Sequence, residues 1–117
     1  MPRKVRTTPT LTSEDTLTPA RAWTAALETA AMRARDRYPL DADRIRRGVD
    51  LITRGHVTLL ERGAMVRSGR KPDDYTYAVN GTCQCEAQDR AKDRGDTSYR
   101  CSHRWAATLY RRAITLL

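Results

Sequence analysis

The sequence predicts one α+β domain, in which two N-terminal helices and a final helix pack with a small antiparallel sheet. Its length of 117 residues is typical of a single domain and leaves too little chain for two independent cores. Apolar residues recur at helical spacing early and late in the chain, while the middle alternates as half-buried strands do. All three cysteines fall within one short window after the last of these strands. We therefore expect one compact unit preceded by an arm.

The arm is residues 1–17, which predict a disordered basic segment because they show no apolar periodicity. Thr18 can then cap a helix, and Pro19 suits a first helical turn. The apolar stripe of this first helix is Ala22, Trp23, Ala26, Leu27 and Ala30. We expect the helix to run to about Tyr38, since Pro39 stops it.

A second, shorter helix completes the helical N-terminal part, residues 18–55. Asp41 offers its cap, and the helix is expected to end around Arg54 and Gly55. Its apolar positions are Ile45, Val49 and Ile52.

Strands are predicted from His56 onward. HVTLLERGAMVRSGR contains two short runs around Gly63, and both read as strands. DDYTYAV alternates apolar and smaller residues, with Tyr75, Tyr77 and Val79 set against Thr76 and Ala78. These runs predict a small antiparallel sheet at the start of residues 56–117, the second part of the same domain.

The end of the chain predicts a loop and a helix. Residues 86–100 are densely charged and indicate a short helical turn followed by an exposed loop. After His103, an apolar stripe predicts the last helix, with Trp105, Leu109, Ala113 and Leu116 on one face.

Composition indicates how thick the core can be and in which cell compartment the protein is expected. Phe is absent and aromatic residues make up 6% of the chain, so the core should be thin and helped by a metal or a partner. No apolar run approaches the roughly 18 residues that span a bilayer, and the N-terminus lacks the apolar run of a secretory signal. We expect a cytoplasmic protein without a membrane partner.

The window TCQCEAQDRAKDRGDTSYRCSH holds Cys83, Cys85, Cys101 and His103 as two close pairs. Structural zinc takes four such ligands in a tetrahedron, and an odd number of cysteines in a reducing compartment argues against disulfides. The pattern predicts one structural zinc ion that clips the end of the sheet to the last helix. The competing interpretation is three buried thiols and an unrelated histidine. A redox role is weaker, because C-x-C is not the C-x-x-C of thioredoxin-like sites.

This arrangement resembles the SWIM zinc finger. The matching text is YTYAVNGTCQC and YRCSHRWAATLYRRA, that is, C-x-C after a strand and C-x-H before an apolar helix. Similar modules occur in bacterial chromatin-remodelling-type helicases, mutator-type transposases and some ubiquitin-pathway proteins. The resemblance covers roughly residues 56–117 and implies zinc-dependent binding of DNA or of proteins, with the four ligands named above. The loop is more charged than in a typical member, and no helicase or transposase domain accompanies the module.

Catalysis is not expected. A catalytic zinc keeps an open position for water beside an acid or base, whereas four protein ligands fill this site. Glu86 follows Cys85 and is interpreted as a solvated side chain, and His56 as a surface or capping residue. Without a constellation of nucleophile, base and oxyanion donor, we expect no enzyme activity and no small-molecule substrate.

The net charge of +8 favours a polyanionic partner, although a solvated surface is the simpler alternative. Two segments near the cysteines carry basic residues without a carboxylate: Arg62, Arg67, Arg70 and Lys71 in the first, and Arg104, Arg111 and Arg112 in the second. We predict nucleic-acid binding, DNA in preference to RNA, mainly through arginine contacts with phosphates. Arg3, Lys4 and Arg6 of the arm are candidates for further phosphate contacts. The alternative is that the arm is a solvated tail with no role in binding.

The rival function is an adaptor that binds a larger enzyme, with the zinc ion purely structural. Trp23 and Trp105 lie on helical stripes and are interpreted as core residues. Tyr75, Tyr77 and Tyr99 are not assigned to the core, and one or more of them can stack on an unpaired base if exposed.

Overall fold

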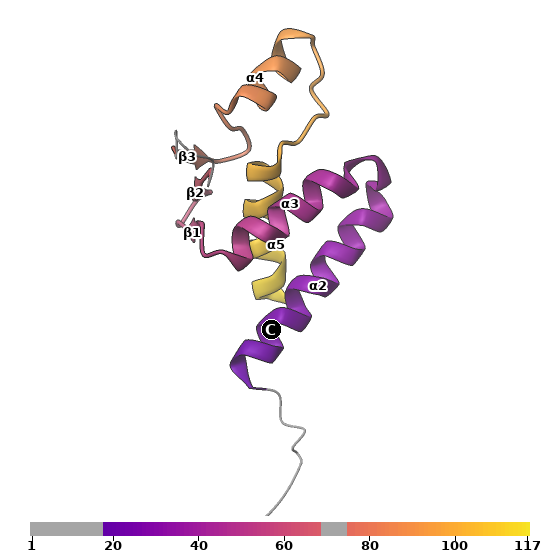
Figure 1. The fold of residues 1–117 in the computed structure, drawn as a ribbon, viewed down its shortest axis with the longest axis vertical. Coiled ribbons are helices and arrows are strands. Elements are labelled where there is room, and N and C mark those ends of the chain that lie inside the picture. Colours follow the sequence, from indigo (N-terminus) through magenta and orange to yellow (C-terminus); the bar gives the residue numbers. More distant parts are fainter. Residues whose placement is uncertain (1–17, 69–74) are drawn as a thin grey trace, which may run out of the picture.

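The computed structural model describes residues 18–68 and 75–117, and it shows the α+β fold that the sequence predicts (Figure 1). The arm at 1–17 and two of the predicted phosphate contacts, Arg70 and Lys71, lie outside the described residues. In chain order the elements are α2 (Pro19–Arg37), a 3₁₀ turn (Pro39–Asp41), α3 (Ala42–Thr53), β1 (Val57–Leu59), β2 (Ala64–Arg67), β3 (Thr76–Val79), α4 (Glu86–Asp93) and α5 (Ser102–Thr115).

The predicted helix boundaries are confirmed, with one correction at a cap. Thr18 caps α2, because its Oγ1 accepts a hydrogen bond from the backbone N–H of Arg21 at 3.2 Å. Asp41 stands at the N-cap position of α3, but its side chain does not cap the helix. One carboxylate oxygen instead pairs with Arg44, and the other accepts a hydrogen bond from Nε1 of Trp105 at 3.2 Å. A charged partner and an indole donor hold this carboxylate away from the helix backbone.

Helix α5 lies at the centre of the fold, with α2 and α3 packed along it. Its residues Trp105, Leu109 and Ala113 are fully buried, as the stripe predicts, whereas Leu116 is 38% exposed. The face of α2 that meets the core is mostly alanine, and these small side chains let α2 and α5 lie close together. Trp23 is half-buried and packs on Tyr110, with 5.0 Å between ring centroids.

Gly48 lies at a close approach between α3 and α5. A Cβ atom at this position would lie 3.0 Å from the backbone nitrogen of Ala106 and 3.2 Å from Cβ of Trp105. Both contacts belong to a helix that cannot shift without moving the core. The absence of a side chain at Gly48 therefore sets the distance between the two helices.

We expect Gly48→Leu to destabilise the domain by about 1–3 kcal/mol through overpacking, since leucine otherwise favours a helix. The measurement is urea unfolding of both proteins. Arg46→Leu is the matched control, because Arg46 lies on the same helix with its side chain 68% exposed. Equal stabilities of the two variants would show that α3 and α5 do not require this close approach.

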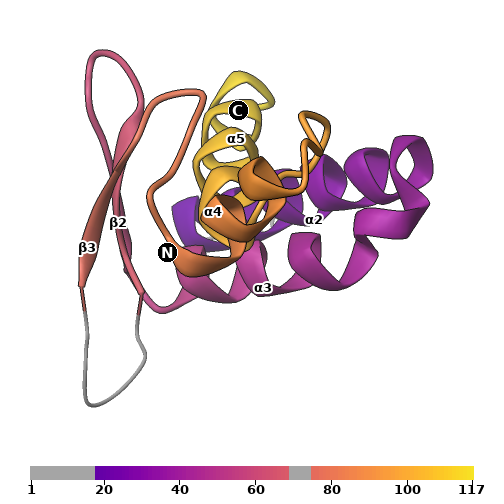
Figure 2. The ribbon, with the colours of Figure 1, turned by 90° about the horizontal axis from the view of Figure 1, so that it is seen from above.

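The sheet has the order β1-β2-β3 and is antiparallel throughout, as predicted. Val57 pairs with Val66, and Ala64 pairs with Val79, so the buried side chains share the face that packs on α5. The sheet stands to one side of the three long helices (Figure 2). Gly63 turns the chain between β1 and β2 with φ +73°, and a Cβ there would lie 2.1 Å from the carbonyl oxygen of Val79.

The charged segment after the sheet is more helical than predicted. Glu86–Asp93 forms the eight-residue helix α4, with Ala91 buried and an ion pair of 3.1 Å between Glu86 and Arg90. Ion pairs between residues four apart stabilise a short helix. The density of charged residues in this segment, taken alone, is more typical of a loop. Among the helices in the described part of the chain, none is long and apolar enough to cross a membrane.

Candidate metal centre

Cys83, Cys85, Cys101 and His103 come together in the fold, where the end of the sheet meets the start of α5. All three thiols are buried and free of disulfides, and His103 is 9% exposed. The ligand atoms of the four side chains all lie within 4.8 Å of one another. The sequence prediction that these four residues form one cluster is therefore confirmed.

Local structure explains how each thiol reaches the cluster. The chain leaves β3 through a turn at Gly81, and Cys83 and Cys85 follow at once. Cys85 is the N-cap residue of α4 and Cys101 is the N-cap residue of α5. The Sγ of Cys101 also accepts the backbone N–H of Arg104 at 3.4 Å. Helix N-termini favour negative charge, so two of the three sulfurs stand where a thiolate is stabilised.

The distances between the ligand atoms are compatible with tetrahedral coordination of one metal ion. Two sulfurs bound to one zinc-sized ion at about 2.3 Å lie about 3.8 Å apart, and a sulfur and a nitrogen lie slightly closer. Nδ1 of His103 is 3.8 Å from Sγ of Cys83 and 4.0 Å from Sγ of Cys101. The four ligand atoms thus need to close by about 1 Å or less to hold one metal ion.

The thiols and the imidazole alter one another's proton affinity. Hydrogen bonds from Cys101 and Cys83 hold the pKa of Cys85 well below its usual range. Hydrogen bonds with Cys101 and Cys85, together with burial, raise the pKa of Cys83. Burial lowers the pKa of His103, but hydrogen bonds to Cys101 and Cys85 and their negative charge outweigh it and raise that pKa to about 9. Such a cluster retains protons that a divalent cation displaces when it binds.

Gln88 joins the two halves of the cluster, and sequence analysis did not single it out. It lies on α4, where its side-chain oxygen accepts the backbone N–H of Cys101 at 3.1 Å and its amide nitrogen donates to the carbonyl of Tyr99 at 3.1 Å. A glutamine three residues after a cysteine in a short helix is the only sequence signal for this role. Supporting contacts of this kind fix the orientation of metal ligands.

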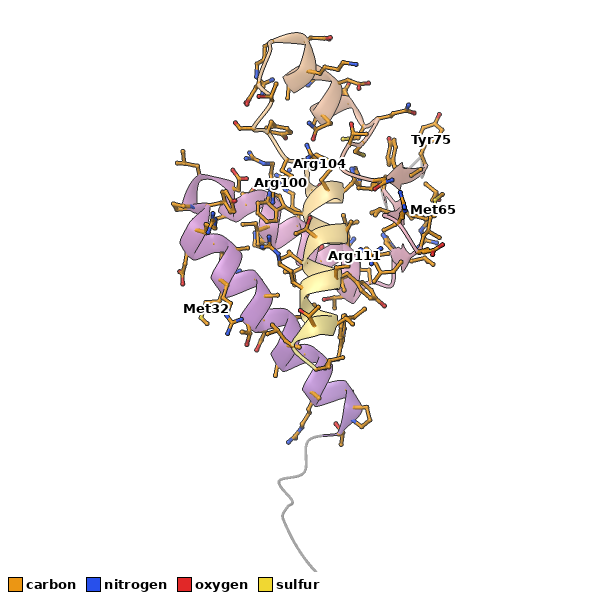
Figure 3. All side chains as sticks on the ribbon, turned by 180° about the vertical axis from the view of Figure 1, so that it is seen from behind. Met32, Met65, Tyr75, Arg100, Arg104 and Arg111 are labelled. Carbon is orange, nitrogen blue, oxygen red and sulfur yellow. The ribbon has the colours of Figure 1, made fainter. Side chains whose placement is uncertain are left out.

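Two arginines fix the backbone that leads into Cys101. Arg104 donates to the carbonyl of Tyr99 at 2.9 Å, and Arg44 donates to the carbonyl of Arg100 at 2.9 Å. Arg104 lies in the first turn of α5, and Arg100 lies just before that helix (Figure 3). Together with Gln88, these contacts position the second ligand pair from three separate helices.

No family model, curated protein or solved structure matches this chain. The centre is thus defined by its own geometry. Three thiols and one imidazole nitrogen, buried and close together, can hold one metal ion.

The predicted phosphate contacts are dispersed. Arg62 lies in the turn between β1 and β2, Arg67 ends β2, and Arg112 lies near the end of α5; all three are exposed. Arg104 is bound to the backbone before Cys101, as described above. Arg111 donates to the carbonyls of Leu60 and Gly63 at 2.8 and 2.9 Å, so it ties α5 to the β1–β2 turn.

The structure reveals a second set of arginines that sequence analysis missed. Arg44 and Arg47 of α3 and Arg54 at its C-cap recur at helical spacing, and all three border the open cleft beside the metal centre. Their spacing of three and seven residues is the signal that was present in the sequence.

Proposed function

We propose that the cluster binds one structural zinc ion and that the domain binds nucleic acid through arginine contacts with phosphates. Three thiolates and an imidazole are a donor set that zinc prefers. Four protein ligands leave no open position for water, which supports a structural ion and no catalytic role. Glu86, the nearest carboxylate in sequence, is exposed and paired with Arg90, in keeping with a solvated side chain.

The SWIM-type assignment belongs to the same proposal. It is supported by the order of elements around the ligands: β3 precedes Cys83 and Cys85, and α5 begins between Cys101 and His103. The helical part at 18–55 lies outside that resemblance and packs on α5.

The observation that carries nucleic-acid binding is the presence of exposed arginines on a strongly basic chain. The chain has a net charge of +8, and Arg62 and Arg112 are exposed without an ion pair to any carboxylate in residues 18–68 and 75–117. Exposed arginines of this kind are suited to phosphates, which they bind with charge-assisted hydrogen bonds. DNA remains the preferred partner because the resemblance favours it.

The test is binding of short fluorescent DNA to the zinc-loaded protein. We expect tight binding at about 50 mM salt and release towards about 200 mM. The plot of log affinity against log salt concentration should have a slope of about −0.9 for each duplex phosphate contacted. The variant with Arg62→Gln and Arg112→Gln should lose about 0.9 of slope per phosphate contact removed. Arg111 is left intact because its loss would also free the β1–β2 turn.

The matched control carries Arg33→Gln and Arg35→Gln, which remove the same charge from exposed positions of α2. If both double variants bind DNA equally, net charge accounts for the binding and the two named residues do not. If the wild-type protein binds no nucleic acid at low salt, the adaptor function replaces this proposal. Exposed aliphatic side chains at the end of α5, Ile114 at 44% and Leu117 at 69%, favour a protein partner in that case.

A further inference from the structure

We propose that the cleft beside the metal centre binds unpaired nucleic acid, with a base stacked on Tyr75 and phosphates held by Arg47 and Arg54. This inference rests on the proposed nucleic-acid function and gives it a location and a substrate class. The cleft lies between α3, β3, α4 and the start of α5, and its volume is about 920 Å³. That volume is at the upper end of the range for ligand sites, about 300–1,000 Å³. Its principal polar and aromatic walls are Arg44, Arg47, Arg54, Arg90, Tyr75 and Tyr77.

The charge of the cleft favours an anion. Four arginines line it against two carboxylates, Asp50 and Glu86. The buried thiols of Cys85 and Cys101 border the opposite side of the cleft, so a phosphate is expected at the α3 wall, where Arg44, Arg47 and Arg54 lie. That wall is formed by the arginine stripe.

Within the stripe, Arg47 and Arg54 are the two side chains available to a ligand. Arg44 is 26% exposed and already engaged with Asp41 and with the carbonyl of Arg100. Arg47 and Arg54 are 63% and 60% exposed, and among the described residues each has an ion pair only along the helix surface, at 3.1 Å with Asp43 and at 3.2 Å with Asp50. Exposed pairs of this kind contribute little to stability and exchange readily for a phosphate.

The aromatic side chains indicate which form of nucleic acid fits. Tyr99 lies beneath the guanidinium groups of Arg44 and Arg94, at 4.4 and 5.6 Å from the ring centroid. Tyr77 is half-buried, with its ring 4.9 Å from that of His103. Tyr75, by contrast, is 61% exposed at the end of the sheet (Figure 3).

An exposed ring can stack on a base only when that base is not already stacked between its neighbours in a duplex. Tyr75 beside an arginine wall therefore matches a single strand, in which bases and phosphates are both accessible. The same combination, an electropositive groove with an aromatic platform, is what sequence-tolerant single-strand binding requires.

The experiment compares fluorescent oligothymidylate with a short duplex, using the zinc-loaded full chain and a salt titration. We expect Tyr75→Ala to weaken single-strand binding by about tenfold, the scale of one base stack, and Tyr75→Phe to retain it. Duplex binding should be the same for all three proteins. Because the Tyr75 side chain is largely exposed, both variants should keep the metal content and melting temperature of the wild type.

The arginine wall is tested in parallel with a closely matched control. Arg47→Gln and Arg54→Gln should each reduce the single-strand salt slope by about 0.7. Arg46→Gln should not, although Arg46 is 68% exposed, precedes Arg47 on the helix and pairs with the same carboxylate, Asp43, at 2.6 Å. Arg46 does not line the cleft.

The outcomes separate the two proposals. If the wild-type protein binds DNA but Tyr75→Ala matches it and Arg47→Gln matches Arg46→Gln, the cleft is not the site and nucleic-acid binding stands. Equal loss of single-strand and duplex binding in Tyr75→Ala also overturns the preference for unpaired bases. If the wild-type protein binds neither the oligothymidylate nor the duplex, both proposals are contradicted.

Discussion

Replacing Cys83 with serine, or removing the metal with a strong chelator, is expected to lower the free energy of unfolding by at least about 4 kcal/mol. That figure is the stabilisation by a ligand present at about a thousand times its dissociation constant, and structural zinc usually binds more tightly. For a domain of this size the loss corresponds to a fall in melting temperature of more than about 15 °C. The effect is expected to be large because the ligands come from the segments that connect β3, α4 and α5.

Metal content and thermal unfolding are measured together, by elemental analysis and circular dichroism. Gln84→Ser is the matched control, since Gln84 is exposed and stands between two ligands in the sequence. It should keep one equivalent of zinc and the wild-type melting temperature. A chelated protein that melts with the wild type would show that the ion does not support the fold.

Trp105→Ala is expected to cost about 3–5 kcal/mol, the range for deleting a large buried aromatic side chain. Trp105 is fully buried in a chain that has no phenylalanine, so no other side chain in the described residues fills comparable core volume. Its indole also donates to Asp41 at 3.2 Å and meets the ring of Tyr38 edge-on at 5.5 Å. One residue thus joins α5 to the corner between α2 and α3.

Urea unfolding separates the contributions of volume and hydrogen bonding. Trp105→Phe should fall between the wild type and Trp105→Ala, because it keeps a ring but removes the indole donor to one carboxylate oxygen of Asp41. Trp23→Ala is the control for loss of an indole at a half-buried position and should cost less. Similar midpoints for Trp23→Ala and Trp105→Ala, at equal m-values, would contradict the central role of Trp105.

The sequence predicts those features that depend on neighbouring residues. Pro39 and Gly55 stand just beyond α2 and α3, where proline restricts the residue before it and glycine adopts a positive φ, and the alternation of Tyr77 and Val79 with exposed residues follows from strand geometry. The metal centre is predictable for a related reason. Two short ligand pairs already impose most of the geometry of the cluster, and the fold has only to bring the pairs together.

Features that depend on tertiary packing were not predictable. The carboxylate of Asp41 meets Trp105 only because α3 crosses α5, 64 residues along the chain. Arg111 appears in sequence as a free cation, yet its partners are carbonyls of a turn 48 and 51 residues away. The cleft has the same origin, since the arginine stripe and Tyr75 belong to segments that only the folded chain makes adjacent.

The segment between the two ligand pairs begins and ends at the same cluster of three cysteines and one histidine. Gly95, near its far end, has φ +76° and nothing within 4 Å of where a Cβ would lie. Closing a longer loop costs only about 0.6 kcal/mol for each doubling of length, and the ligands already hold the two ends together. This tip is therefore a place where evolution or an engineer can graft extra sequence, such as an epitope or a targeting peptide, without disturbing the rest of the architecture.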